Sequence, residues 1–506
     1  MLIRRAVKTT VTSIFIASSV LISTQLAYAQ LQFQISAYGP ATAASIQSAL
    51  SSLQLEPALR GPLLKMYADI GYQPLFVNGS SLTPLASELR NSLAALQGQG
   101  LDVADYWSQT HEAIIAQGSN LPNALAAELL LAESYVAACV HINVGRVTGP
   151  QASSINKMSP RVFSSMNVLE AGLRGAGIAQ TWDSLAPKAD GYQRLKGALA
   201  QLLNSVSQNR GALGKQILQV ELNMEKYRWL PNDPGARYLT VNTAMQTLRL
   251  TDPTNTNPKL AEMRTINGKP QSPTPSMVDH LGSLELNPPW HVTTNIFARE
   301  KYPEIRAVAM TGNPMALQQW FDQRNFMLIS AANGQPVDPT TVDWINYNPK
   351  SGAVILTERS GYTSSLGVVK FNLQSPPGPY YLHDTDTRAA FANTFRLLSH
   401  GCIRVQNPID LAEYLLAGTG WDRARIEATV LKPGQVPVGN VSVPLAIPKE
   451  NRIPVYVMNL TADVGLDGVL RFAKDLYRDT ANVELALRAS GYLRSGTNSV
   501  SITPRL

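Results

Sequence analysis

The chain is poor in cysteine and in charge. Its 506 residues contain two cysteines, Cys139 and Cys402, and 16% charged residues. An exported fold stabilised by disulfides normally carries several pairs, so the sequence does not belong to that class. The formal net charge of +7 comes from interspersed residues of both signs, which excludes the clustered Lys/Arg stripe of a nucleic-acid-binding surface. A P-loop, a dinucleotide fingerprint and a complete HExxH motif are also missing, so nucleotide-dependent and zincin-type chemistry have no signature here.

The N-terminus has the pattern of a secretory signal. Three basic residues within the first eight precede a mostly apolar run that ends near Leu26, and Ala27-Tyr28-Ala29 is a small-x-small cleavage site. Serines and threonines interrupt this run, which is shorter than the roughly 20 apolar residues of a membrane-spanning helix. We expect residues 1–29 to be removed on export, without stable membrane insertion of the mature chain, and an uncleaved N-terminal anchor is the alternative.

Two regions that differ in residue composition and in the spacing of apolar residues follow. Residues 30–235 are rich in Ala, Leu, Gln and Ser, with apolar residues at helical spacing such as Leu195, Leu199 and Leu202. From residue 236 to 440, short β-rich runs alternate with Pro, Asn and Gly segments. The sequence therefore predicts an α+β protein with a mostly helical N-terminal domain and a β-rich second domain.

Two further segments lie within and after the β-rich domain. Residues from about 297 to 362 have uneven spacing and include a predicted helix around Met315 to Trp320. The remaining residues, 441–506, form a C-terminal segment in which residues 455–458 and 470–472 predict a hairpin. We expect this segment to pack back on one of the two domains.

Cys402 has the surroundings of a nucleophile. It lies in the run Ser399-His400-Gly401-Cys402-Ile403-Arg404, downstream of His383. A thiol attacks carbonyl groups as the thiolate, whose formation a neighbouring base or cation supports. Gly401 permits a backbone geometry in which N–H groups converge on an oxyanion. The following Asn407-Pro408 predicts a helix cap and a helix start.

At these residues the sequence resembles the YkuD-type L,D-transpeptidases, whose signature is a His followed, after a variable spacer, by Ser/Thr-His-Gly-Cys, a small residue and Arg. Further matches to the long periplasmic YcbB-like branch lie along most of the chain, at residues 71–76, 223–231, 268–270, 274–275, 287–292, 366–372 and 453–456. The resemblance implies a scaffold domain at 30–235, a catalytic domain at 236–440 and a capping subdomain at about 297–362. The chain between Leu195 and Asn223 is too short for the peptidoglycan-binding module that many relatives insert there.

The resemblance also implies roles for the residues around the thiol. Cys402 is the expected nucleophile, His383 the expected base, and Gly401 and Cys402 the expected backbone donors to the oxyanion. The expected substrate-binding residues are Tyr381, Ser399, His400 and Arg404.

Several assignments stay open at the level of sequence. His400 is an alternative base, and Arg404 could form an ordinary ion pair instead of binding a substrate carboxylate. Zinc binding by His383, His400 and Cys402 is disfavoured because the H-x-C spacing lacks a second ligand pair, so we expect no metal and no other cofactor. Trp290 could line the cleft or belong to the core.

Cys139 and Asp384 are expected to have structural roles and not catalytic ones. Cys139 ends an apolar helical stretch, so we expect a buried, unreactive thiol and not a disulfide to Cys402. Asp384 adjoins His383, but adjacent residues of a strand point to opposite faces, so we favour a role in a local turn.

These features predict a transferase that cross-links peptidoglycan stem peptides through a cysteine acyl-enzyme, in cell wall biogenesis and cell shape. We expect a monomer in the periplasm of a Gram-negative-type envelope, without nucleic-acid partners, and acylation of Cys402 by carbapenems. The cross-link could be of the 3-3 or the 1-3 type. The alternatives are an L,D-carboxypeptidase, a lipoprotein-attaching transferase of the same family, or an inactive wall-binding protein.

Overall fold

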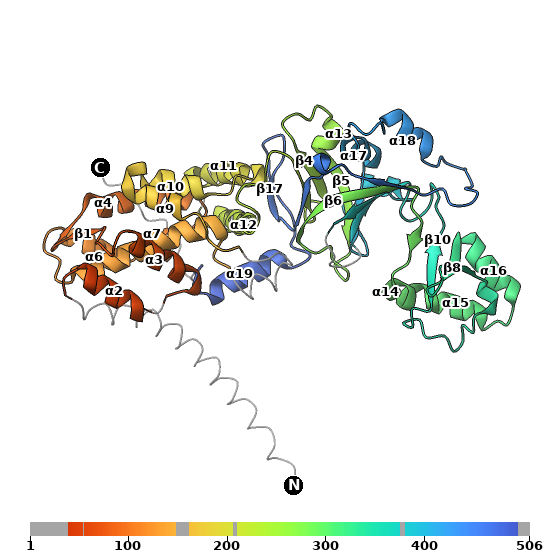
Figure 1. Ribbon diagram of the computed structural model, residues 1–506, viewed down its shortest axis with the longest axis horizontal. Coiled ribbons are helices and arrows are strands. Elements are labelled where there is room, and N and C mark those ends of the chain that lie inside the picture. Colours follow the sequence, from red (N-terminus) through yellow and green to blue (C-terminus); the bar gives the residue numbers. More distant parts are fainter. Residues whose placement is uncertain (1–38, 54, 148–160, 206–209, 375–379, 494–506) are drawn as a thin grey trace, which may run out of the picture. The chain divides into compact units, whose positions relative to one another are not determined.

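The computed structural model describes residues 39–53, 55–147, 161–205, 210–374 and 380–493 (Figure 1). These residues form two units. Of the described residues, the helical unit comprises those up to Asp233, those of Thr461–Phe472 and those from Arg478 onward, and the sheet unit comprises those of Pro234–Leu460 and Ala473–Tyr477. The protein is thus α+β, as predicted. The signal-like residues 1–29 lie outside the described residues.

The helical unit is built around one buried helix, α7 (Ala124–Val144). Asn123 caps its N-terminus, because the side chain of Asn123 accepts a hydrogen bond from the Ala126 N–H. By length and composition α7 could cross a membrane, but 83% of its apolar window is buried inside this unit. A helix that is apolar all round is expected in such a core. The other helices are α2 (Ala43–Ser52), α3 (Pro57–Asp69), α4 (Pro84–Asn91), α5 (Leu93–Gly98), α6 (Gln109–Gln117), α9 (Met166–Ala171), α10 (Ile178–Leu185), α11 (Asp190–Ser205), α12 (Arg210–Tyr227) and α19 (Asp479–Ala489).

The end of α12 contains a buried charge cluster. Glu225 accepts hydrogen bonds from Arg228 Nη1 at 2.9 Å and from the Val147 N–H at 3.2 Å, and it also pairs with Arg146. Burial alone would raise the pKa of Glu225, but the two arginines and the backbone N–H groups hold it below its ordinary value. Residues 223–230, which carry most of one of the matches noted in the sequence, are therefore buried in the interior of the helical unit, and Pro231 is exposed.

The sheet unit is organised by one large sheet. Its strands follow the order β11-β12-β14-β5-β4-β3-β16-β6-β15, and β13 pairs with β5. Because β6 pairs with β11 as well as with β16, the sheet closes on itself. The strands are β3 (Tyr238–Asn242), β4 (Thr247–Thr251), β5 (Glu262–Gly268), β6 (Met277–Leu286), β11 (Val369–Leu373), β12 (Tyr381–His383), β13 (Leu397–Ser399), β14 (Ile403–Val405), β15 (Val443–Ala446) and β16 (Pro454–Met458).

Helices cover part of this sheet. They are α13 (Pro258–Ala261), α17 (Pro408–Leu415) and α18 (Arg423–Thr429), and Leu411, Leu415 and Ile426 join the core of the sheet. The helix α17 begins at Pro408, as predicted, but the Asn407 side chain does not cap it. Instead, Asn407 Nδ2 donates to the Lys259 carbonyl at 3.0 Å.

Residues 290–358 form a small body with its own hydrophobic core, called the inserted body below. Its sheet has the order β7-β10-β8-β9, and Trp320, Phe321 and Trp344 are among its buried residues. Figure 1 shows its helices gathered beside β8 and β10. The predicted helix around Met315 is α16 (Pro314–Gln323). The other elements are β7 (Trp290–His291), α14 (Thr294–Ile296), η3 (Phe297–Lys301), α15 (Tyr302–Ala309), β8 (Phe326–Ser330), β9 (Pro336–Val337) and β10 (Val354–Glu358).

The C-terminal segment differs from the predicted hairpin. The run 454–458 is β16, which pairs in parallel with β3 and extends the large sheet beyond residue 440. The hairpin consists instead of β17 (Ala462–Val464) and β18 (Leu470–Phe472), which flank Asp467-Gly468. The turn was thus correctly located, whereas its first strand was not.

Candidate active site

The register of three neighbouring strands gathers the predicted residues on one face. β12 and β14 are parallel, with His383 opposite Arg404 and Leu382 opposite Ile403. Tyr381 precedes Leu382 as Cys402 precedes Ile403, so the same register brings Tyr381 beside Cys402. Since side chains two residues apart share a face, Tyr381, His383, Cys402 and Arg404 point to the same side. Leu382 and Ile403 point to the other side and belong to the hydrophobic core.

Cys402 is a cysteine outside any disulfide and is neither fully buried nor fully exposed. Tyr381 contacts its sulfur through both a backbone and a side-chain hydrogen bond. Burial raises the pKa of the Cys402 thiol, and the contacts with Tyr381 and the charges of Lys370 and Arg404 partly oppose that rise. The resting group is therefore a thiol whose conversion to thiolate needs a base.

His383 is buried, with 4% of its surface exposed. Burial and the nearby positive charge of Arg404 lower its pKa to about 3, with a smaller opposing effect from the Asp384 backbone. The imidazole is therefore neutral near pH 7 and can accept a proton. Within the described part of the chain, its Nδ1 has no hydrogen-bond partner. Its ring centroid lies 5.4 Å from that of Tyr381, whose hydroxyl contacts the sulfur of Cys402.

The loop before Cys402 is fixed by hydrogen bonds to the β5–β6 connection. Thr274 Oγ1 donates to the Gly401 carbonyl at 2.8 Å and accepts from the Gly268 N–H at 2.9 Å. The Lys269 N–H donates to the Ser399 carbonyl at 2.9 Å, and Tyr477 donates to the Gly268 carbonyl. Thr274 and Tyr477 were not among the predicted site residues, because nothing local in the sequence brings them to this loop.

Gly401 has a φ of +117°, a region in which side chains are strained. A Cβ at this position would also lie 2.9 Å from Tyr380 Cε1. The Gly401 N–H, an expected oxyanion donor, here donates to Ser399 Oγ at 3.2 Å, while Ser399 Oγ donates to the Cys402 carbonyl at 2.6 Å. The structure thus gives Ser399 a bracing contact within the loop, and the Gly401 N–H is engaged in that contact.

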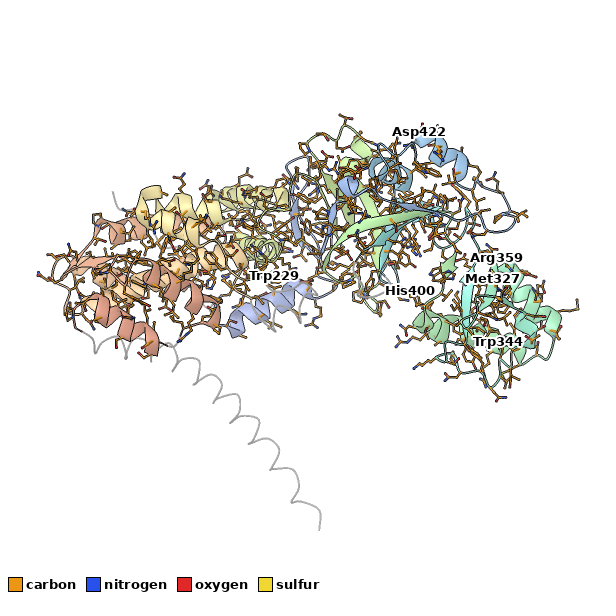
Figure 2. All side chains as sticks on the ribbon, in the orientation of Figure 1. Trp229, Met327, Trp344, Arg359, His400 and Asp422 are labelled. Carbon is orange, nitrogen blue, oxygen red and sulfur yellow. The ribbon has the colours of Figure 1, made fainter. Side chains whose placement is uncertain are left out.

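His400 faces the inserted body (Figure 2). Its Nε2 lies 2.7 Å from Glu300 Oε1 on η3 and 3.3 Å from Lys269 Nζ. This contact engages one ring nitrogen of His400 with Glu300. Of the two candidate histidines, His383 is the one that the strand register places on the same face as Cys402.

Arg404 has no carboxylate partner among the described residues. Its Nη1 donates to Thr387 Oγ1 at 2.9 Å, and its buried Nε has no hydrogen-bond partner in the described part of the chain. The alternative of an ordinary structural ion pair is thus not seen. The guanidinium keeps donors available on the same face as the thiol.

Asp384 points away from the thiol, as the strand alternation predicts. Its Oδ2 accepts from the Val368 N–H at 2.9 Å and pairs with Arg388. Burial raises the pKa of Asp384, against the opposing charge of Arg388. The residue braces the chain at Gly367–Val368, where an added Cβ at Gly367 would collide with its carboxylate.

The remaining assignments concern Trp290, Cys139 and metals. Trp290 is partly buried against the core of the inserted body and also hydrogen-bonds Tyr381, so it combines the two predicted roles. Cys139 is fully buried and free, as predicted, and burial raises its pKa to about 12. Across the described ranges, no three His, Cys, Asp or Glu side chains are grouped to hold a metal ion.

Comparisons with known proteins give matches for both regions of the chain. Residues 236–437 match the YkuD family, described as the L,D-transpeptidase catalytic domain, and residues 62–199 match a scaffold domain. A protein of Haemophilus influenzae named "Putative L,D-transpeptidase" is 24% identical over 439 residues, which cover 86% of this chain and 80% of that protein. The chain therefore contains a catalytic domain of the YkuD L,D-transpeptidase family together with an N-terminal scaffold domain.

Proposed function

We propose that this protein cross-links peptidoglycan stem peptides through an acyl-enzyme on Cys402. The observation that carries the proposal is the shared strand face of Cys402 and a neutral His383. The family match supports acyl transfer on peptidoglycan, and the signal-like N-terminus supports a site of action in the periplasm.

In the first half-reaction, His383 accepts the Cys402 proton while Sγ attacks the carbonyl of the third stem residue. The negative charge that develops on the oxygen needs nearby N–H donors. Collapse of the intermediate breaks the C–N bond, and the departing terminal D-amino acid takes the proton held by His383. The product is a thioester between Cys402 and the shortened donor stem.

In the second half-reaction, an acceptor amine loses a proton to His383 and attacks the thioester carbonyl. The thiolate leaves and regains its proton, which restores the resting enzyme. An amine from meso-diaminopimelate gives a 3-3 link, and the N-terminal amine of a stem gives a 1-3 link. Attack by water at this step gives an L,D-carboxypeptidase, which is the principal alternative.

The proposal is tested with purified disaccharide-tetrapeptide muropeptides, alone and with free tetrapeptide stems, because only a stem released from its sugar carries the N-terminal amine that a 1-3 link requires. Wild type and Cys139→Ala, which removes the buried thiol, should form cross-linked dimers, whereas Cys402→Ala should form none. Tandem mass spectrometry of the dimers distinguishes 3-3 from 1-3 links, and tripeptide without dimers would identify the hydrolytic alternative. Full cross-linking by Cys402→Ala would refute the nucleophile assignment.

Carbapenems provide an independent test of the same sulfur. We expect intact-mass spectrometry to show one drug adduct on wild type and on Cys139→Ala, and none on Cys402→Ala. Peptide mapping should place the adduct on Cys402. An adduct that persists in Cys402→Ala would show that another group is acylated.

A further inference from the structure

A second cation lies on the same face as the predicted site residues. Lys370 on β11 is directly opposite His383 on β12, which is in turn directly opposite Arg404 on β14. Residues directly opposite one another in paired strands share a face. Lys370 and Arg404 therefore flank the imidazole on the side that carries Cys402.

Lys370 makes no ion pair in the part of the chain that the structure describes. Its Nζ lies 4.8 Å from the centroid of the Tyr381 ring, and the Tyr381 hydroxyl contacts the sulfur of Cys402. The cross-strand neighbour of Lys370 on β6 is Glu285, whose carboxylate accepts from Ser442 Oγ. The ammonium of Lys370 thus lies over the ring of Tyr381, and the hydroxyl of the same ring contacts the thiol of Cys402.

A cation that has no ion-pair partner in a partly buried site stabilises a negatively charged form of a group close to it. The charged or titratable groups that face Lys370 or Cys402 from neighbouring strands and loops are Glu285, His291, Tyr380, Tyr381, His383, Asp386 and Arg404. Above about pH 4 His383 is uncharged, so the positive potential at the sulfur comes from Lys370 and Arg404. Asp386 acts on Arg404, whereas the carboxylate opposite Lys370 is that of Glu285.

We propose that Lys370 is a positioning residue for Cys402, whose ammonium favours the thiolate and holds the Tyr381 ring against the sulfur. This inference rests on the proposed function only in taking Cys402 as the nucleophile. The thiol proton goes to His383 during acyl transfer, or to solvent during alkylation, and Lys370 keeps its own protons throughout. A cation over an aromatic ring contributes about 0.5–2 kcal/mol, so the contact can also order the phenol.

The test is the rate at which Cys402 is alkylated by iodoacetamide as a function of pH, in the Cys139→Ala background. Iodoacetamide is neutral, so its approach does not depend on the charge at position 370. Below the midpoint, the rate falls roughly tenfold for each unit by which the thiol pKa rises. We expect Lys370→Met to react about tenfold more slowly at pH 8, and Lys370→Arg to react within about twofold of the parent.

Lys449→Met is the matched control, because Lys449 is an exposed lysine of the same unit that lies outside β11, β12 and β14. It should leave the alkylation rate unchanged, and thermal unfolding checks that each variant is folded. Equal rates for Lys370→Met and the parent would overturn the proposal, as would equal losses in Lys370→Met and Lys370→Arg. Alkylation requires no peptidoglycan, so this result is independent of whether the protein forms cross-links.

Discussion

Thr274→Val tests whether the loop that carries Cys402 is held by one hydroxyl group. Thr274 is 2% exposed, and its Oγ1 links the Gly268 N–H to the Gly401 carbonyl. Valine keeps nearly the same shape but removes both hydrogen bonds. The N–H of Gly268 and the carbonyl of Gly401 are themselves on buried residues, so both groups would lose a partner that water cannot easily replace.

The size of the effect follows from these two contacts. A buried polar group that loses its partner costs about 1–3 kcal/mol. Because Gly401 Cα and its carbonyl can shift by a small amount, we take the lower part of that range for each group and expect a loss of about 2–4 kcal/mol for the sheet unit. The same shift displaces Cys402, which adjoins Gly401, so we expect the rate of carbapenem acylation to fall about tenfold to a hundredfold.

Two measurements check this expectation. Urea-induced unfolding gives the loss of stability, and single-turnover acylation followed by intact mass gives the rate. Thr274→Ser retains the hydroxyl and removes one methyl group, so it should recover most of the acylation rate and cost about 1 kcal/mol. If Thr274→Val matches wild type in both stability and acylation rate, the hydroxyl does not hold the loop and the reasoning fails.

Two further predictions concern His383 and Gly401. Because burial lowers the pKa of His383 to about 3, the unfolded chain binds a proton below about pH 6.5 that the folded chain does not. The contribution of His383 to the free energy of unfolding should therefore be complete above that pH, and it should fall by about 1.4 kcal/mol per pH unit as the pH falls toward 3. Urea midpoints measured as a function of pH should show this dependence in wild type and not in His383→Gln. Gly401→Ala should lose about 1–3 kcal/mol and most of its acylation activity, since φ is +117° and the new methyl would meet Tyr380. Gly434→Ala, at φ +79° in open space, is the control that carries backbone strain without a collision, and equal acylation by the two variants would contradict the proposed steric cause.

The sequence predicted features that depend on local pattern. The apolar helix around Cys139, the start of α17 at Pro408 and the helix at 314–323 all follow from helical periodicity or from proline at a helix start. The opposite orientation of Asp384 and His383 follows from strand alternation alone. Each of these properties is set by residues within a few positions of one another.

The features that were missed depend on pairing between distant segments. The strand at 454–458 pairs with β3, more than two hundred residues earlier, and no local pattern distinguishes that partner from a nearby hairpin. Thr274, Tyr477 and Lys370 reach the site for the same reason, through the register of β5, β6 and β11 or through the chain's return near its end. The choice between His383 and His400 also required the inserted body, because Glu300 provides the contact for His400.

The parallel pairing of β12 with β14 has a consequence for how the chain can vary. The positions of His383 and Cys402 are set by the ladder between two adjacent strands, and the residues that connect those strands loop away through exposed positions such as Asn393 and Phe395. Extra residues inserted there would lengthen the connection without altering which atoms meet. The relative position of His383 and Cys402 therefore does not depend on the number of residues that connect β12 to β14. This connection can vary in length and sequence without moving the two residues apart.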